Sequence, residues 1–232
     1  MKKIEELINR EFLCECGRTH RVPIREIRSW NDPIPPEAFE RAFGGRGVRS
    51  ALMICDAHTK SCANDRVAET LNGLGWRMKV REFINGGGDR LANDESAVGA
   101  AVLDADSGVD GIIAVGGGTV TDLGRFVASR LGKPFVLVMT CPSMDGYASN
   151  IAAMSLDGKR RIFKDCRYPD AIFCNLRVMR GAPMDLIRSG FGDMLGKRTS
   201  LPDWVLSRHV TGERFCGMTA ALMDDSSMRC IR

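Results

Sequence analysis

The hydrophobic pattern at the centre of the chain alternates short apolar runs with a longer periodic segment. Residues 111–115 (GIIAV) are apolar, rich in branched side chains, and followed by three glycines, Gly116–Gly118. This order predicts a buried strand that runs into a tight turn. Residues 134–140 (PFVLVMT) are the next apolar run and predict a second strand.

Between these two runs, apolar residues recur at the spacing of a helix. Those positions are Val120, Leu123, Phe126, Val127 and Leu131. We expect the helix to end at Gly132 and Pro134, and Thr119 and Asp122 have the spacing of a capping pair at its start. The centre of the chain is therefore predicted to be strand, glycine turn, helix and strand.

The same alternation extends towards the N-terminus. Strands are expected at 50–55 and 78–84, helices at 65–74 and 94–105, and a loop at 85–89. Alternating strands and helices predict an α/β fold, a Rossmann-like parallel sheet with helices on both faces and right-handed crossovers.

The pattern changes after Asn150. Two segments, 151–156 and 161–164, flank Asp157-Gly158, which predicts a β-hairpin. A further strand is expected at 169–175, and a helix begins at Pro183 that we expect to be broken by the glycines around Asp193.

We therefore expect three parts. Residues 1–47 are predicted to hold an N-terminal helix, a hairpin and a connector, because 23–47 contains four prolines. Residues 48–180 are predicted to form a nucleotide-binding α/β domain. Residues 181–232 are predicted to be the start of an all-helical domain that is cut short.

The composition is that of an ordinary globular protein. Of 232 residues, 44% are hydrophobic and 27% charged, and the formal charge is only +4. The compact basic run Lys159–Arg161 is expected to be a solvated hairpin face, so nucleic-acid binding is not indicated. The start of the chain has neither a secretion signal nor a spanning helix, which predicts a cytoplasmic protein without membrane insertion.

The chain has nine cysteines, which we expect to be reduced thiols in a cytoplasmic protein. Cys14, Cys16 and His20 form a CxCGxxH cluster that is compatible with half of a zinc site. However, CxC lacks the usual two-residue spacer, and no second CxxC or HxxxH pattern completes four ligands. The sequence therefore favours a purely structural hairpin over a metal site.

The glycine turn suggests a phosphate site, because glycines allow backbone N–H groups to approach a ligand at the positive end of a helix. The second strand ends in a polar segment, 140–149, at the strand edge where open α/β sheets bind ligands.

Three carboxylates each have two interpretations. Asp56 at a strand end is either a cap or a ribose contact, and position alone favours the cap. Asp145 is either a turn residue or part of a site, and Asp193 is either a helix cap or a ligand.

Three motifs carry a family resemblance. GGGTVTD (116–122), TCPSMDGYAS (140–149) and SGFGDMLGKRTSLPDW (189–204) resemble the sn-glycerol-1-phosphate dehydrogenases, within the superfamily of metal-dependent polyol dehydrogenases and dehydroquinate synthases. The similarity covers roughly residues 45–215. It implies NAD(P)-dependent interconversion of sn-glycerol 1-phosphate, a small phosphorylated substrate, and dihydroxyacetone phosphate. It also implies a divalent metal, zinc or nickel, that acts as a Lewis acid, and a homo-oligomer is compatible with it.

The resemblance also implies site residues. Asp145 would contact the substrate, and Asp193 would bind both metal and substrate, which makes these two the catalytic residues. Asp56 would accept hydrogen bonds from the adenosine ribose and favour NAD over NADP. The residues expected to bind the cofactor are Asp56, Gly116, Gly117, Gly118, Thr119, Val120, Thr140, Ser143 and Ser149.

In the family, two histidines on later helices complete the metal site. The histidines of this sequence, His20, His58 and His209, do not match those positions. We therefore expect either a fragment or frameshifted gene, or a partner that supplies the rest. Two alternatives to the phosphate-specific enzyme stay open: a glycerol or other polyol dehydrogenase of the same superfamily, and a truncated, inactive nucleotide-binding domain.

Overall fold

The computed structural model describes residues 6–31, 33–84 and 91–232, and the chain divides into two compact units. The first, here called the α/β unit, comprises Ile24–Pro142 and Gly146–Ala182. The second, here called the helical unit, comprises Met1–Pro23, Ser143–Asp145 and Pro183–Arg232. The loop expected at 85–89 and most of the expected N-terminal helix lie outside the described residues.

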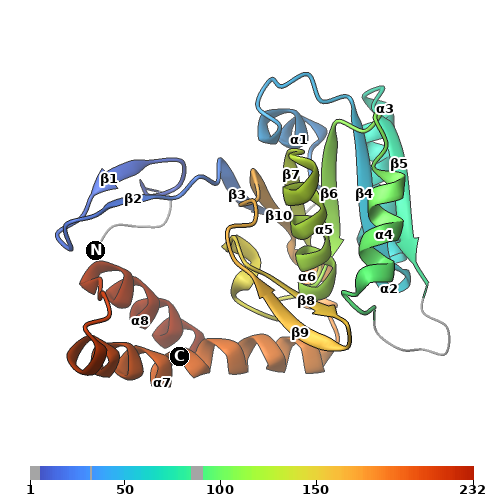
Figure 1. Cartoon of the computed structure of the whole chain (residues 1–232). Coiled ribbons are helices and arrows are strands. Elements are labelled where there is room, and N and C mark those ends of the chain that lie inside the picture. Colours follow the sequence, from blue (N-terminus) through green and yellow to red (C-terminus); the bar gives the residue numbers. More distant parts are fainter. Residues whose placement is uncertain (1–5, 32, 85–90) are drawn as a thin grey trace. The chain divides into compact units, whose positions relative to one another are not determined.

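The α/β unit is built on one six-stranded parallel sheet, as the alternating pattern predicts (Figure 1). Its strand order is β3-β10-β7-β6-β4-β5. The strands are β3 (Glu26–Trp30), β4 (Ser50–Asp56), β5 (Arg77–Phe83), β6 (Gly111–Gly116), β7 (Phe135–Met139) and β10 (Ala171–Asn175). The expected strands at 50–55, 78–84, 111–115, 134–140 and 169–175 are all confirmed within one or two residues of their ends.

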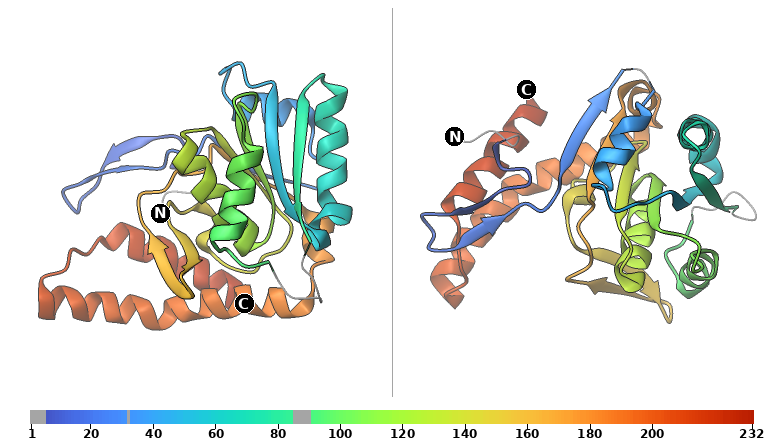
Figure 2. Two further views of the ribbon diagram at one scale, coloured as in Figure 1. Left: turned by 45° about the vertical axis from the view of Figure 1, so that its right-hand side comes forward. Right: turned by 90° about the horizontal axis from the view of Figure 1, so that it is seen from above.

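Helices cover both faces of this sheet. Helices α1 and α3 pack on one face and α4 and α5 on the other, as the views in Figures 1 and 2 show. The helices of the unit are α1 (Pro36–Ala42), α2 (Ala57–Thr59), a π-helix (Lys60–Asn64), α3 (Asp65–Gly73), α4 (Glu95–Asp104), α5 (Gly118–Leu131), a 3₁₀-helix (Gly146–Ala148) and α6 (Leu176–Arg180). On the first face, Phe39 of α1 and Leu71 of α3 belong to the same buried cluster as Met53 of β4. Burial on both faces explains why the strands are uniformly apolar.

The segment 23–47 is part of the sheet rather than a connector. It contains β3, which pairs in parallel with β10, and α1, whose Phe39 is fully buried. The prolines that suggested a connector instead precede or begin α1, where proline lacks only a hydrogen bond that the first helical turn does not make.

The predicted hairpin after Asn150 is confirmed as β8 (Ala152–Leu156) and β9 (Lys159–Phe163), a separate antiparallel pair. Asp157 and Gly158 both have positive φ, at 52° and 67°. This is the combination that a tight two-residue hairpin turn requires.

The helical unit contains a short hairpin, β1 (Glu11–Leu13) and β2 (Thr19–Arg21), and two helices, α7 (Met184–Thr211) and α8 (Gly217–Ile231). The expected break around Asp193 is wrong, because α7 runs without interruption through its glycines and through Pro202. A glycine costs a helix only about 1 kcal/mol, which packing can offset. One tertiary contact of α7 is made by Trp204, whose indole N–H donates to the carbonyl of Arg214 at 2.9 Å.

Within the described residues, no helix combines the length and the hydrophobicity that crossing a lipid bilayer requires.

Candidate functional site

The strand order identifies where this sheet is expected to bind a ligand. Strand β4 pairs with β5 on one side and β6 on the other, so the chain reverses its winding direction between β4 and β6. Open parallel sheets bind ligands at such a switch point, beyond the carboxyl ends of the strands. At that edge β4 ends at Asp56 and β6 ends at Gly116.

The glycine turn leads directly into α5. Gly117 is the N-cap residue, with φ −85° and ψ −160°, and no side chain caps the helix. The expected capping pair of Thr119 and Asp122 is therefore wrong. Thr119 is exposed, and the Asp122 carboxylate accepts hydrogen bonds from Arg125 and from the backbone N–H of Ala153. A helix N-terminus without a side-chain cap offers backbone N–H groups and a positive dipole end to an anion.

Gly116 is required by close packing rather than by a special backbone angle. A Cβ atom at this position would lie 2.5 Å from the Cβ of Val120, closer than two carbon atoms approach. The side chain of Val120 is buried, so the expected contact of Val120 with a cofactor is limited to its backbone. The turn thus brings the end of β6 and the first turn of α5 together.

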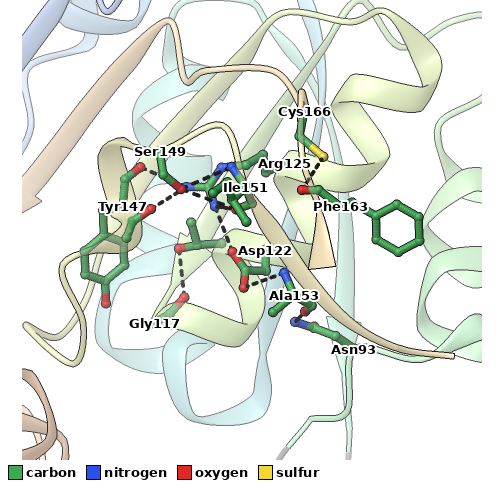
Figure 3. A network of polar contacts seen from close by, with 12 residues as sticks. Asn93, Gly117, Asp122, Arg125, Tyr147, Ser149, Ile151, Ala153, Phe163 and Cys166 are labelled. Carbon is green, nitrogen blue, oxygen red and sulfur yellow. Dashed lines mark hydrogen bonds and ion pairs between the residues drawn. The ribbon is translucent and has the colours of Figure 1, made fainter. Parts of the chain in front are cut away.

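Arg125 organises the loop that follows β7 (Figure 3). It lies on α5 and is fully buried. Its guanidinium donates to the carbonyl oxygens of Gly146 (3.0 Å), Tyr147 (2.9 Å) and Ile151 (2.6 Å), and it forms an ion pair of 2.7 Å with Asp122. One side chain therefore holds three backbone carbonyls of the segment that carries Ser149.

Asp122 completes this network by accepting the backbone N–H of Ala153 at 3.2 Å. Burial raises the pKa of the Asp122 carboxyl and lowers the pKa of the Arg125 guanidinium, despite the attraction between them. Sequence reasoning missed Arg125. The available signal was a single arginine on an apolar helix face, between Gly124 and Phe126.

Two further predicted cofactor residues belong to the same unit. The backbone N–H of Thr140 donates to the carbonyl of Gly116 at 3.3 Å, and Thr140 itself is buried. The hydroxyl of Ser149 accepts the N–H of Ile151 at 3.2 Å. These residues thus lie in the loop anchored by Arg125 or beside the glycine turn.

Asp56 is a helix cap in this structure. Its Oδ1 accepts the backbone N–H of Thr59 at 2.8 Å, and the Thr59 hydroxyl accepts the N–H of Asp56 at 3.1 Å. This reciprocal pair is a capping box at the start of α2. The interpretation that position alone favours is confirmed, and a ribose contact stays a prediction.

The helical unit brings the two predicted catalytic carboxylates together, and Ser143 belongs to the same unit. The N–H of Asp145 donates to Oδ2 of Asp193 at 2.8 Å. The ammonium of Lys197 lies 2.8 Å from Oδ2 of Asp145 and 3.5 Å from Oδ1 of Asp193. Asp193 lies inside α7, so the helix-cap interpretation is wrong. Sequence reasoning did not single out Lys197, although it lies four residues after Asp193 on the same helix face.

Neighbouring groups shift the pKa values of Asp193 and Lys197. The hydrogen bond to Asp145 raises the pKa of Lys197 above its usual range. Partial burial acts to raise the pKa of Asp193, but the hydrogen bonds from Asp145 and Lys197 outweigh it and the pKa is lowered. The Asp193 carboxylate is therefore held ionised beside the ammonium of Lys197.

The side chains around Asp193 do not supply a complete set of ligands for the metal that the resemblance implies. Among the described residues, Asp145 and Asp193 belong to no group of three or more His, Cys, Asp or Glu side chains that converge on one point. A catalytic zinc takes three protein ligands. These two carboxylates alone do not fit a catalytic divalent ion.

Comparison with known proteins places this geometry in a family. Residues 37–183 match the model of the family described as iron-containing alcohol dehydrogenase. The chain belongs to the iron-containing alcohol dehydrogenase family. It is 34% identical to a glycerol-1-phosphate dehydrogenase [NAD(P)+] of Bacillus licheniformis over 94% of this chain and 54% of that protein. It is 35% identical to a protein of the same name from Halalkalibacterium halodurans over 88% of this chain and 50% of that protein.

Solved structures of iron-containing alcohol dehydrogenase type share the fold. A glycerol dehydrogenase from Schizosaccharomyces pombe covers 80% of this chain and 45% of its own, with a TM-score of 0.60 and 20% identity. An NADH-dependent butanol dehydrogenase A from Thermotoga maritima covers 77% of this chain and 49% of its own, with a TM-score of 0.65 and 19% identity. The chain spans about half the length of the curated relatives it matches.

Proposed function

We propose that this chain carries the cofactor-binding half of an NAD(P)-dependent sn-glycerol-1-phosphate dehydrogenase. That enzyme interconverts dihydroxyacetone phosphate and sn-glycerol 1-phosphate, and the bound cofactor supplies or accepts the hydride. The observation that carries the proposal is the uncapped glycine turn Gly116–Gly118 at the switch point of the sheet, leading into the 14-residue helix α5. The relatives named glycerol-1-phosphate dehydrogenase support this substrate over an unphosphorylated polyol.

Different residues of the α/β unit bind different parts of the cofactor. The backbone of Gly117, Gly118 and Thr119 binds the pyrophosphate, because these amides begin a helix that no side chain caps. Asp56 accepts hydrogen bonds from the ribose and disfavours a 2′-phosphate by like charge, which favours NAD. Thr140 and Ser149 support the nicotinamide half.

In the helical unit, Asp193 would supply one ligand to a divalent metal, zinc or nickel, whose other ligands come from elsewhere, and Asp145 would contact the substrate. The ammonium of Lys197 forms ion pairs with both carboxylates, and its positive charge would attract a substrate phosphate. Two carboxylates do not complete a catalytic metal site, so turnover requires ligands beyond the residues described here. We accordingly expect the 232-residue chain to bind cofactor with little or no turnover by itself.

The cofactor site is tested with a matched pair of substitutions at Gly117. Asp and Asn are both good N-cap residues, so Gly117→Asp and Gly117→Asn both keep α5 capped, and only the first adds negative charge. We expect Gly117→Asp to bind NADH about tenfold more weakly than Gly117→Asn, because a carboxylate repels the pyrophosphate. Isothermal titration of the purified chain measures this. Equal affinities in the two variants would contradict the site.

The substrate is tested with the same chain and added metal. NADH oxidation is followed with dihydroxyacetone phosphate, and separately with dihydroxyacetone, in the presence of zinc or nickel. Oxidation only with the phosphorylated substrate supports the proposal, whereas equal oxidation with both favours a polyol dehydrogenase. Cofactor binding without any oxidation would agree with an incomplete catalytic metal site. This chain would then act as a nucleotide-binding domain only.

Location and assembly follow from the same proposal. NAD(P) and small phosphorylated metabolites are pools of the cell interior, so we infer a cytoplasmic protein. Light scattering of the purified chain tests whether identical subunits associate, as the incomplete metal site would allow.

A further inference from the structure

Four side chains of the helical unit converge at a place that the proposed dehydrogenase chemistry does not use. Cys14 and Cys16 lie in the loop of the β1–β2 hairpin, His20 lies on β2, and Cys216 is the N-cap residue of α8. One potential ligand atom from each lies within 4.8 Å of all the others. Cys14 and Cys216 are buried, and Cys16 and His20 are half-buried.

The local sequence shapes the hairpin half of this cluster. The N–H of Cys14 donates to the carbonyl of Arg18 at 2.8 Å, and the N–H of Gly17 donates to the carbonyl of Cys14 at 2.9 Å. Gly17 has a φ of 78°, a left-handed conformation that glycine adopts without strain. This tight turn brings Cys14, Cys16 and His20 to one side of the loop.

The distances match those between ligands of one tetrahedral zinc ion. Zn–S bonds of about 2.3 Å and Zn–N bonds of about 2.0–2.1 Å separate two sulfurs by about 3.8 Å, and a sulfur from a nitrogen by about 3.5 Å. Here the Sγ atoms of Cys14 and Cys216 are 3.7 Å apart. Nε2 of His20 lies 3.3 Å from Sγ of Cys16 and 3.5 Å from Sγ of Cys216. A disulfide would place two sulfurs about 2.0 Å apart.

The helical unit also lacks the apolar core that would hold these elements together. Among its described residues, the buried hydrophobic side chains are those of Leu7, Cys14 and Cys216. Units with so little apolar burial are commonly stabilised by a structural metal. Two of the three buried side chains are themselves members of the cluster.

We propose that Cys14, Cys16, His20 and Cys216 bind one zinc ion and that this closed Cys₃His site fastens the β1–β2 hairpin to the start of α8. Thiolate and imidazole ligands in a tetrahedral arrangement select zinc, and four protein ligands leave no open position for a substrate. The site is therefore structural and separate from the Asp145–Asp193 pair. The sequence favoured a hairpin without metal because the fourth ligand, Cys216, lies 196 residues after His20.

The state of Cys216 agrees with this role. Cys216 is the N-cap residue of α8, where the positive end of the helix dipole favours a negatively charged thiolate. A thiolate at the start of a helix is the form that binds metal.

The test measures metal in the purified chain and in matched variants. We expect about one tightly held zinc per wild-type chain by plasma mass spectrometry. Cys16→Ser and Cys216→Ser should lose most of it, whereas Cys230→Ser, an exposed cysteine of the same helix, should retain it. Asp193→Asn should also retain it, which separates this site from the proposed catalytic metal.

A spectroscopic measurement on the unmodified chain covers the case in which the serine variants fail to fold. Cobalt(II) exchanged into the wild-type chain should give the intense visible bands of a tetrahedral ion and thiolate-to-cobalt charge transfer. A metal-free wild-type chain, a weak octahedral cobalt spectrum, or a disulfide that links Cys14 to Cys216 in the native protein would each overturn the proposal.

Discussion

The backbone N–H of Asp145 donates a 2.8 Å hydrogen bond to Oδ2 of Asp193, across 48 residues of sequence. The ammonium of Lys197 contacts both carboxylates and offsets part of their negative charge. The two aspartates that the resemblance assigned to catalysis thus meet in one unit of the fold.

Asp193→Asn tests this trio through stability. The pKa of Asp193 is lowered in the folded chain, so its stabilisation is present above the ordinary value of 3.8 and is lost as the pH falls through the folded pKa. We expect the variant to lose about 1 kcal/mol at neutral pH, a small figure because the Asp193 side chain is 35% exposed, and to approach wild type in strong acid. Urea unfolding over a pH series measures this. Asp203→Asn, an exposed position on the same helix, should differ little from wild type at any pH.

Asp145→Asn tests the substrate role. Asparagine keeps the turn before Gly146 and removes only the carboxylate. In an enzyme with its complete metal site, we expect turnover with dihydroxyacetone phosphate to fall by about tenfold or more. Unchanged turnover would assign Asp145 to the turn alone.

Asp56→Asn should change the choice of cofactor. Asparagine still caps α2, so folding is preserved, but the charge that repels a 2′-phosphate is gone. We expect the ratio of NADPH to NADH affinity to rise about tenfold, equivalent to about 1.4 kcal/mol. Asp94→Asn, which alters the N-cap of α4 in the same way, is the matched control. An equal ratio in the two variants would assign Asp56 to capping only.

Arg125→Met should destabilise the α/β unit. It leaves Asp122 as an unpaired, largely buried carboxylate and frees three carbonyls of the loop that follows β7. Breaking a buried pair in this way costs about 3–5 kcal/mol. Arg130→Met, on the same helix but exposed above Phe126 and Phe163, should cost less than about 1 kcal/mol. The two values come from urea denaturation, and similar losses would contradict the special role of Arg125.

Gly116→Ala tests the close approach of β6 and α5. The new Cβ would lie 2.5 Å from Cβ of Val120, so the first turn of α5 must shift. We expect a loss of about 1–3 kcal/mol in unfolding free energy. Gly99→Ala in α4 meets no atom within 4 Å and should instead gain about 0.5–1 kcal/mol. If Gly116→Ala proved as harmless as Gly99→Ala, the packing argument for the turn would fail.

The sequence by itself determined the features that depend on neighbouring residues. The apolar runs predict β4, β6 and β7, and the helical spacing before Gly132 predicts the extent of α5, because strand burial and helix termination are local. Asp157-Gly158 predicts its hairpin, because its turn needs two residues that tolerate positive φ. The motifs at 116–122, 140–149 and 189–204 predicted the family that the comparison confirmed.

Only the tertiary structure decided the features that depend on distant residues. Proline content concealed β3, whose place at the sheet edge depends on pairing with β10. The continuity of α7 depends on packing that offsets its glycines and Pro202. Arg125 gained its role from carbonyls more than 20 residues away, and Cys216 joined Cys14 across 202 residues. Such convergence in space has no local sequence period, so the chain must fold before these residues meet.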